Sequence, residues 1–338
     1  GGLLALSAAA LPPVSRRALL AASSVAAATH YPFSALAAAA AAAPAALPAA
    51  VATPPLSARL RGSSLAVPLR ELGVSSQPGQ LRYPPWLLGT WRLHNAIAAF
   101  SMPLGRAFAD GFTQYSARSD IEREVAYDYS MRWVAEPASG AAGAVGLSAV
   151  QDRAFNAAEE TFAFLEDQGV KVERSRYSTA SQGSHGLIEL ELSEDGATGP
   201  RTTIQLEVQW CQWQQLPDGA FLTDEMILQR VTTSGEPGQP EIAEATLIES
   251  ITRFEPPLQA ARRGDRNPAP PGSVRARNRL AQYLLPSPAQ QGGGALDPGG
   301  ARAAKMAALA AGRAVTMFDY EWRLTPTAED LPITGLSA

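Results

Sequence analysis

The chain has 338 residues, of which 46% are hydrophobic and 18% are charged, so it is long and apolar enough to bury a sizeable core. Its formal net charge is −4 at pH 7, which argues against nucleic-acid binding, because phosphate contacts need a basic face. The single cysteine, Cys211, excludes an intramolecular disulfide and a cysteine-based metal cluster. With only three histidines, a zinc or iron site would depend on a carboxylate cluster, and the sequence shows none, so no metal or cofactor is expected.

Residues 1–58 differ in composition from the rest of the chain. They contain no acidic residue, and their only charges are Arg16 and Arg17. A short apolar segment and several Ala-x-Ala sites follow this pair, and together these are the parts of a twin-arginine targeting signal. An alanine-rich coding bias is the alternative explanation. We expect residues 1–58 to be a disordered leader that is cleaved, and residues 59–80 to be a linker.

A twin-arginine signal fits two compartments, the chloroplast thylakoid lumen and the space outside a bacterial inner membrane. The chain does not begin with Met, so an upstream piece such as a transit peptide would have preceded it in the chloroplast case. After the leader, no stretch offers the roughly 20 apolar residues that a membrane-spanning helix needs. The protein is therefore not expected to be transmembrane.

From Arg82 onward, polar and apolar residues alternate over segments of about ten residues. This period of two is typical of strands that bury one face, and several segments exceed the length of about 5–6 residues usual in open sheets. Long antiparallel strands of this kind favour a closed barrel, in which no strand edge stays exposed. The eight predicted strands are residues 87–100, 125–134, 170–178, 186–196, 201–213, 217–231, 242–254 and 316–326.

Two segments break this alternation. Residues 152–169 place apolar side chains at helical spacing, which predicts one short helix. Residues 256–311 are rich in Pro, Gly, Ala and Arg and are predicted to be a disordered insert. Within this insert, residues 273–285 are predicted to form a helical turn or two, with arginines that face water or touch an anionic membrane surface. The sequence thus predicts a single barrel domain over residues 81–328.

The first and last predicted strands carry a recognisable pair of features. Gly89 and Trp91 form a Gly-x-Trp motif where the first strand begins, and Arg323 lies in the last strand. This combination resembles the lipocalins and the wider calycins, although so short a motif also occurs by chance. The resemblance implies a mainly β protein with an eight-stranded antiparallel lipocalin-like barrel, whose floor contains Gly89, Trp91 and Arg323. The arginine would pack on the indole face, and Arg253 is the alternative partner.

A second resemblance covers roughly residues 81–326. The segment Pro84-Pro85-Trp86-Leu87-Leu88-Gly89-Thr90-Trp91, the segment Met102-Pro103-Leu104-Gly105, and the closing Tyr320-x-Trp322 are similar to an uncharacterised family of cyanobacterial and plastid proteins. The resemblance implies the thylakoid lumen as the compartment. It supplies no catalytic residues.

No arrangement of residues indicates catalysis. The sequence contains no Gly-x-Ser-x-Gly, no His-x-x-x-His and no glycine-rich phosphate loop. Ser184 and His185 are neighbours in the chain, and their side chains are expected to point apart. Asp128 and Glu225 fit solvated strand faces better than a catalytic carboxylate pair. The sequence therefore favours a protein that is not an enzyme.

Aromatic and apolar residues gather on the strand faces that are predicted to point inward. If these faces line a cavity, the barrel would hold a small apolar ligand such as a lipid, a pigment or a fatty acid. The alternative is a barrel filled by its own side chains, which would serve as an assembly or scaffold factor for a photosynthetic membrane complex of the thylakoid. The candidate cavity residues are Tyr127, Tyr129, Met131, Trp133, Leu206 and Trp210.

Overall fold

The fold was obtained as a computed structural model. It describes residues 55–66, 80–109, 111–136, 148–166, 169–179, 186–194, 201–233, 242–257, 270, 272–284, 310 and 312–327. Arg16, Arg17, Ser184 and His185 lie outside the described residues.

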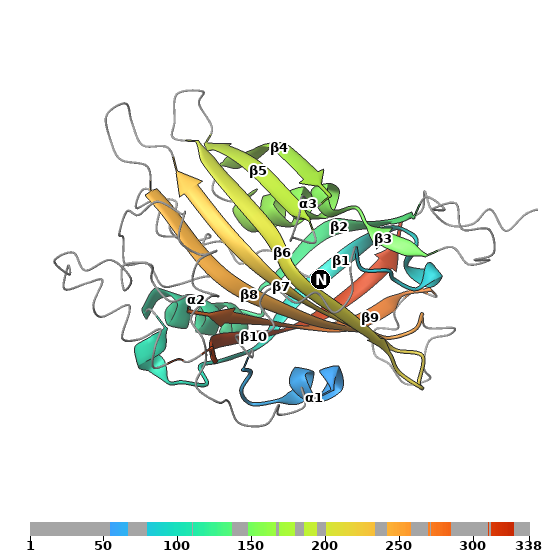
Figure 1. The fold of residues 1–338 in the computed structure, drawn as a ribbon, viewed down its shortest axis with the longest axis horizontal. Coiled ribbons are helices and arrows are strands. Elements are labelled where there is room, and N and C mark those ends of the chain that lie inside the picture. The colour runs from blue at the N-terminus through green and yellow to red at the C-terminus, as the bar shows by residue number, and fades with distance from the viewer. Residues whose placement is uncertain are drawn as a thin grey trace, which may run out of the picture.

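Ten strands form one antiparallel sheet that curves into a half-barrel (Figure 1). Their spatial order is β3-β2-β1-β10-β9-β8-β7-β6-β5-β4, so neighbours in the chain are mostly neighbours in the sheet. β3 and β4 are the two edges and are not hydrogen-bonded to each other. The bounds are β1 Gly89–Ser101, β2 Ala126–Ala135, β3 Ala149–Gln151, β4 Val170–Ser178, β5 Leu187–Glu194, β6 Thr202–Gln215, β7 Phe221–Thr233, β8 Ile242–Phe254, β9 Val274–Tyr283 and β10 Ala314–Pro326.

The sheet agrees with the sequence in its eight long predicted strands and differs in two others. The strand β3 has only three residues, too few to show an alternating pattern in the sequence. β9 falls inside the segment that was predicted to be a disordered insert with helical turns, and this prediction is wrong for residues 274–283, because β9 pairs with β8 and with β10. Its arginines, Arg275, Arg277 and Arg279, stand at every second position, which is the spacing of a strand and not of a helix.

Three α-helices accompany the sheet in the described part of the chain. They are α1 Leu56–Arg61, α2 Gly111–Glu122 and α3 Arg153–Leu165, and two single 3₁₀ turns, η3 Pro85–Leu87 and η4 Arg106–Phe108, flank β1. Only α3 was predicted. It begins after Asp152, whose carboxylate accepts a hydrogen bond from the Phe155 backbone N–H at 3.2 Å and caps the helix.

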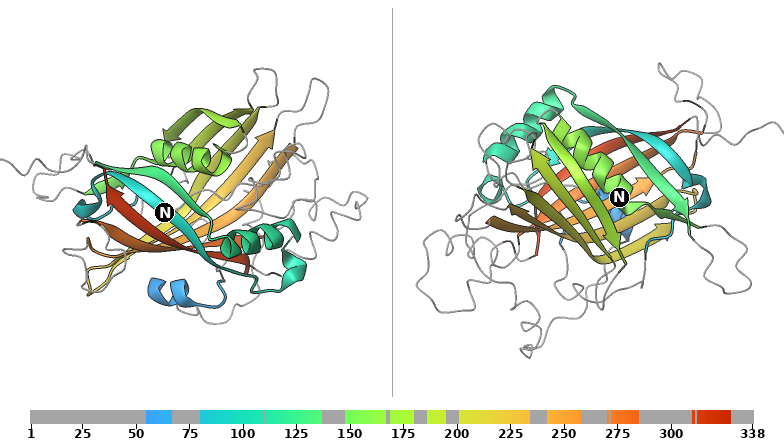
Figure 2. Two further views of the ribbon diagram at one scale, coloured as in Figure 1. Left: turned by 180° about the vertical axis from the view of Figure 1, so that it is seen from behind. Right: turned by 90° about the horizontal axis from the view of Figure 1, so that it is seen from above.

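Helix α3 lies in the opening between the two edges of the sheet (Figure 2). It packs against β2 on one side and β4 on the other, and its buried residues face the concave side of the sheet. The half-barrel is thus closed by a helix, where a closed barrel would use strand pairing. The helix packs against β4 at one edge, and the strand at the other edge, β3, has only three residues, so both edges offer little backbone for pairing with other chains.

Apolar side chains pack on both faces of the sheet. The larger cluster fills the concave side and includes Trp91, Trp133, Leu206, Phe254 and Phe318. A smaller cluster on the convex side includes Trp210, Met226 and Leu228, and Leu60 of α1 packs against it. Because both of its faces are covered, β7 is buried at almost every position.

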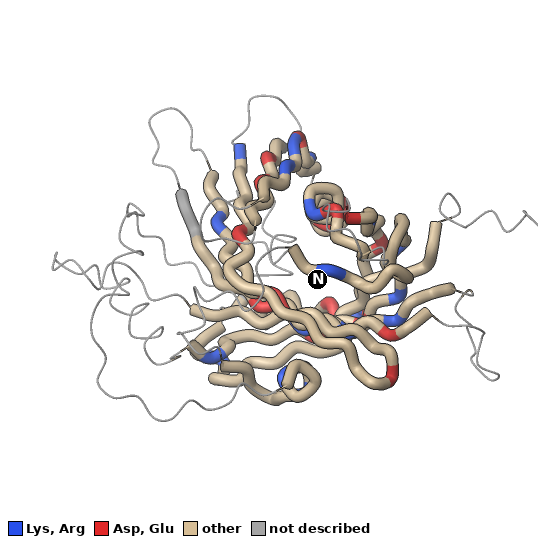
Figure 3. The backbone as a smooth tube through the Cα atoms, turned by 45° about the vertical axis from the view of Figure 1, so that its right-hand side comes forward, with Lys and Arg blue, Asp and Glu red and all other residues tan. Residues whose placement is uncertain are grey.

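Charges of both signs are interspersed along the chain (Figure 3). On the β4–β5 hairpin, for example, Arg174 and Arg176 pair with Glu191 and Glu189 across the strands. None of the described helices is long and apolar enough to cross a membrane.

Candidate functional site

One end of the half-barrel is covered by the segment of residues 80–88, which precedes β1. The Tyr83 backbone exchanges two hydrogen bonds with Ala149 of β3, at 2.7 and 3.1 Å. The Tyr83 ring then lies 6.0 Å from the Trp133 ring, 5.7 Å from the Phe221 ring and 6.0 Å from the Phe254 ring. These three residues come from β2, β7 and β8, so the Tyr83 ring lies in the middle of the covered end.

A buried ion pair lies beside Tyr83. Arg153, the first residue of α3, pairs with Glu225 of β7, and both side chains are almost completely buried. Burial has the largest influence on the pKa of Arg153 and lowers it. The charge of Glu225, then Tyr83, the hydrogen bond to Glu225 and Tyr177 act in the opposite direction and raise the pKa above its usual value. Arg153 therefore stays charged and is neutralised locally by Glu225.

The field at this end of the interior is unfavourable for further negative charge. Burial, and after it the charge of Glu225, raise the pKa of the Tyr83 hydroxyl well above its usual value, and Arg153 lowers it by less. The same two influences raise the pKa of the Cys211 thiol to about 12. At both positions Glu225 outweighs Arg153, so an anion is disfavoured beyond the cost of burial alone.

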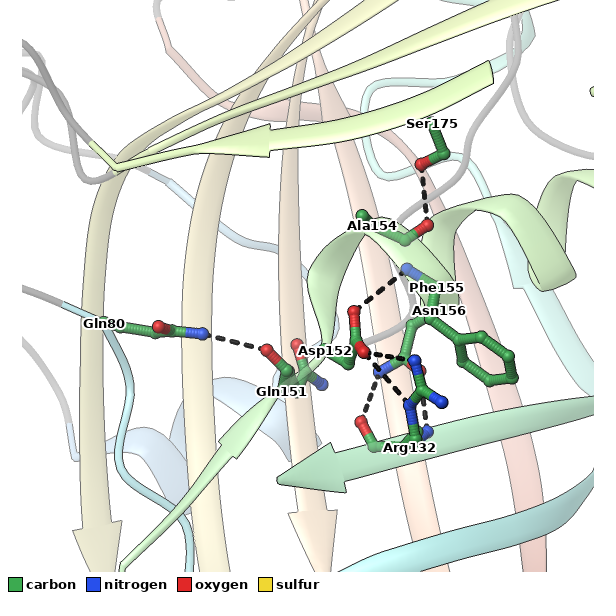
Figure 4. A network of polar contacts seen from close by, with 8 residues as sticks. All are labelled: Gln80, Arg132, Gln151, Asp152, Ala154, Phe155, Asn156 and Ser175. Atoms are coloured by element: carbon green, nitrogen blue, oxygen red, sulfur yellow. Dashed lines mark hydrogen bonds and ion pairs between the residues drawn. The ribbon is translucent and has the colours of Figure 1, made fainter. Parts of the chain in front are cut away.

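Helix α3 is fixed to the sheet at its first turn, which positions Arg153 (Figure 4). The Arg132 guanidinium of β2 donates to the Asp152 carboxylate, with 3.0 Å between Nε and Oδ2. The Asn156 side chain accepts from the Arg132 backbone N–H at 2.7 Å and donates to the Arg132 carbonyl at 3.2 Å. On the other side, the Ser175 hydroxyl of β4 donates to the Ala154 carbonyl at 2.7 Å.

Several buried polar atoms at the covered end make no hydrogen bond of normal geometry to any described residue. They are the Trp133 indole N–H, both atoms of the Gln151 amide, Nε and Nη1 of Arg153, and the hydroxyls of Tyr83 and Thr223. The hydroxyls of Tyr83 and Thr223 approach each other without reaching that geometry, and Tyr177 likewise approaches the Arg153 guanidinium. Gln151 is the register partner of Trp133 and lies two residues before Arg153, so these atoms belong to one region. We call Tyr83, Trp133, Gln151, Arg153 and Thr223 the polar end of the interior.

Elsewhere on the concave face, several buried polar side chains have partners. The Trp322 indole donates to Asn95 at 3.1 Å. The Asn278 amide donates to Ser250 and Thr252 at 2.9 and 2.8 Å. One further group on this face lacks a partner among the described residues: the amide of Gln229, which lies on β7 between Ile227 and Val231 of the concave cluster. Most of the unsatisfied groups on the concave face nevertheless gather at the polar end.

Five of the six predicted cavity residues belong to the concave side. Tyr129, Met131, Trp133 and Leu206 are buried in the concave cluster, and Tyr127 packs against it. The ring of Tyr127 lies 4.2 Å from the ring of Phe164 on α3, so the helix completes the aromatic wall.

Trp210 is the exception. The alternation over β6 predicted that it shares a face with Leu206 and Val208, but an irregularity in the β6–β7 register falls between Val208 and Trp210. Beyond it, Trp210 lies in the convex cluster and Cys211 lies in the concave one. One extra residue in a strand reverses which face each later side chain occupies, and a single sequence does not reveal it.

Of the three residues predicted to form the barrel floor, Gly89 and Trp91 lie together and Arg323 does not join them. Gly89 and Trp91 do lie at the covered end, where the Trp91 indole donates to the Leu87 carbonyl at 2.8 Å. Arg323 does not pack on this indole, because it is exposed between the buried residues Trp322 and Leu324 and so faces the convex side. Arg253, the alternative, is also on the convex side and pairs with Asp218 at 2.6 Å. The buried arginine at this end is Arg153.

The two carboxylates singled out in the sequence, Asp128 and Glu225, lie in different environments. Asp128 is exposed and lies 3.1 Å from His94 on the neighbouring strand, whereas Glu225 is buried inside with Arg153. Glu225 was predicted to lie on a solvated face, and this is wrong, because both faces of β7 are covered. Within the described ranges, no group of three or more His, Cys, Asp or Glu residues is arranged to hold a metal ion.

A second buried ionic cluster lies on the convex side. Arg59 of α1 pairs with Glu249 of β8 and lies 3.7 Å from Asp224 of β7, and Tyr283 of β9 donates to Glu249. Leu56 and Arg59 are buried. Residues 56–61, which were assigned to the end of the leader and the start of the linker, thus form a helix packed on the sheet.

The comparisons with known proteins find a family that matches part of the chain. A family described as a domain of unknown function (DUF6816) matches residues 75–181, a range that holds the covering segment, β1 to β4 and α3. The match includes Tyr83, Trp133, Gln151 and Arg153 and stops short of Glu225. No curated protein and no solved structure matches the chain.

Sequence reasoning missed Arg153, Gln151 and Tyr83. One signal was present at Arg153: a cation in the first turn of a helix opposes the helix dipole and needs a nearby anion. The partner is 72 residues away, so the chain itself did not reveal it.

Proposed function

We propose that this protein binds a small, largely apolar molecule inside the half-barrel. The observation that carries the proposal is the polar end, where buried donors without partners face an otherwise apolar and aromatic interior. A pocket that is mostly apolar, with a few convergent polar groups, is the usual form of a small-molecule site.

The energetics favour a ligand over a core filled only by side chains. A buried polar group left without a partner costs about 1–3 kcal/mol, and native proteins rarely keep several in one place. A bound molecule that accepts these hydrogen bonds would recover that free energy. Ordered water is the competing occupant, since buried water commonly satisfies such groups.

The proposed role is binding and not catalysis. The Cys211 thiol lies close enough to Tyr83 to influence its pKa, and it is held in the protonated form because burial and Glu225 raise its own pKa to about 12. Arg153 and Glu225 are engaged with each other in a buried ion pair.

We further propose that Arg16 and Arg17 target the protein to the thylakoid lumen, with bacterial export as the alternative compartment. The buried positions of Leu56 and Arg59 support a leader that ends before Pro55. N-terminal sequencing of the protein from its native compartment is then expected to begin upstream of Pro55. A mature chain that retains Arg16 would contradict the leader.

The binding proposal is tested by extraction and by titration. Protein purified without detergent is extracted with organic solvent, and the extract is analysed for lipid, pigment and fatty acid. In parallel, a carotenoid, a chlorophyll and a fatty acid ester are titrated while tryptophan fluorescence is recorded. We expect saturable quenching at one molecule per chain by at least one of them. If none binds and the extract is empty, a filled scaffold protein becomes the better account, and co-purification with a thylakoid membrane complex would support it.

A further inference from the structure

The polar end has more hydrogen-bond donors than acceptors. Trp133 Nε1 and the two Arg153 nitrogens can only donate, because indole and guanidinium N–H groups have no lone pair to offer. The hydroxyls of Tyr83 and Thr223 can donate or accept, and the Gln151 amide does both. A molecule that satisfies the donor-only atoms must therefore bring an acceptor oxygen.

The charge of the site decides which acceptor fits. Arg153 is already neutralised by Glu225, so an incoming carboxylate would add a buried negative charge with no cation to balance it. Such a charge costs several kcal/mol in a low-dielectric interior. The raised pKa values of Tyr83 and Cys211 point the same way, because both groups resist becoming anions beside Glu225.

The concave face beyond the polar end determines which kind of ligand body can bind next to the acceptor oxygen. Beyond the polar end, the concave face is formed mainly by apolar and aromatic side chains, and polar groups such as Asn278 and Trp322 already have partners. The Gln229 amide of β7 is an exception. A long apolar body therefore suits most of this region.

We infer that the ligand is an uncharged apolar molecule that ends in a carbonyl oxygen, as an ester, a ketone or a quinone does. This inference rests on the proposed function and adds the chemical class of the ligand. The carbonyl oxygen accepts hydrogen bonds from Trp133 Nε1 and the Arg153 guanidinium, and the hydrocarbon body lies along the aromatic wall.

A matched series of three compounds tests the class. Methyl decanoate, decanoate and decane share a chain length and differ in the polar end, and each competes at pH 8 with a fluorescent apolar probe for the full-length protein. We expect the ester to bind about tenfold more tightly than decane, which corresponds to about 1.4 kcal/mol for its hydrogen bonds. We expect decanoate, ionised at this pH, to bind more weakly than the ester by at least a similar factor.

A pair of variants tests the position of the carbonyl. Trp133→Phe removes an indole donor that has no partner, and it should lower the affinity for the ester about tenfold with little change for decane. Trp322→Phe is the matched control, because its indole already donates to Asn95. This control should leave the preference for ester over decane intact.

The possible failures are distinguishable. If decane binds as tightly as the ester, or if decanoate binds best, the chemical class is wrong while binding itself stands. If none of the three compounds displaces the probe and the probe itself does not bind, the proposed function fails. The compound series uses the unmodified protein, so it decides the matter even if Trp133→Phe does not fold.

Discussion

Arg153 and Glu225 join helix α3 to strand β7 through an ion pair whose side chains are 1% and 0% exposed. The half-barrel has no backbone pairing between its edges, so this contact and the Arg132–Asp152 anchor hold the closing helix in place. The same arginine supplies donors to the polar end. Closure and the proposed binding therefore share one residue.

Removing one partner of this pair should be costly. Glu225→Gln leaves the Arg153 charge buried without an anion, and we expect the free energy of unfolding to fall by about 3–5 kcal/mol in urea denaturation. Glu191→Gln on the exposed β4–β5 hairpin is the control, since an exposed pair contributes about 0–1 kcal/mol. Equal losses for the two variants would show that the buried pair does not hold α3.

Replacing an unsatisfied group should have the opposite effect. Gln151→Met keeps a similar shape and removes a buried amide without partners, so we expect the ligand-free protein to become about 1 kcal/mol more stable. Asn278→Leu is the contrast, because it removes an amide that donates to Ser250 and Thr252 and should destabilise the fold. Destabilisation by Gln151→Met would indicate that its amide has a partner in solution.

The buried ionic cluster on the convex side, which contains Arg59, Asp224 and Glu249, predicts that the stability of the fold depends on pH. Burial, and then the charge of Glu249, raise the pKa of Asp224 well above its ordinary value of 3.8, although Arg59 and Gln212 lower it. The folded state therefore holds this proton more tightly than the unfolded state. The stabilisation that the protonated Asp224 carboxyl contributes is fully present below about pH 3.8, and it is lost as the pH rises through the folded-state pKa.

The variant Asp224→Asn has no titrating carboxyl at this position, so comparing it with the wild-type protein isolates the effect of Asp224. We expect the wild-type protein to lose stability relative to Asp224→Asn as the pH rises from 4 upward, measured by urea unfolding at each pH. Tyr283, Glu249 and Arg59 face the same group and are unchanged in both proteins. A difference that stays constant with pH would show that Asp224 does not have a raised pKa.

The buried thiol provides a simple probe of the closed half-barrel. Because the pKa of Cys211 is raised to about 12, almost no thiolate exists at pH 8, and the side chain is also covered. Alkylation of the native protein should be far slower than alkylation in urea. Rapid labelling of the native protein would mean that this end of the interior opens readily.

Much of the sheet was visible in the sequence because burial of one face imposes a period of two. That pattern located eight of the nine long strands and placed Tyr129, Met131 and Trp133 together. It failed at β9, where the flanking Pro and Gly residues and the many arginines outweighed the alternation at Arg275, Arg277 and Arg279. It also failed at Trp210, where the register irregularity in β6 is decided by packing between strands.

The polar end could not be predicted from a single sequence, because most of its residues are distant from one another in the chain. Its members come from the covering segment, β2, β3, α3 and β7, and nothing local marks them as neighbours. The lipocalin-like resemblance led to Arg323 as the basic residue of the floor, but the alternation in β10 already places Arg323 opposite Trp322 and Leu324. Only the folded arrangement brings Arg153 to that end.

The most direct test of the central claim is the indole N–H resonance of Trp133 in a ¹⁵N-labelled sample. The protein has six tryptophans, and Trp133→Phe assigns the signal by its loss. We predict that methyl decanoate shifts this resonance downfield and saturably at one molecule per chain, whereas the Trp322 signal, already bonded to Asn95, moves little. A Trp133 resonance that stays unchanged at saturating ester would contradict a ligand carbonyl at the polar end.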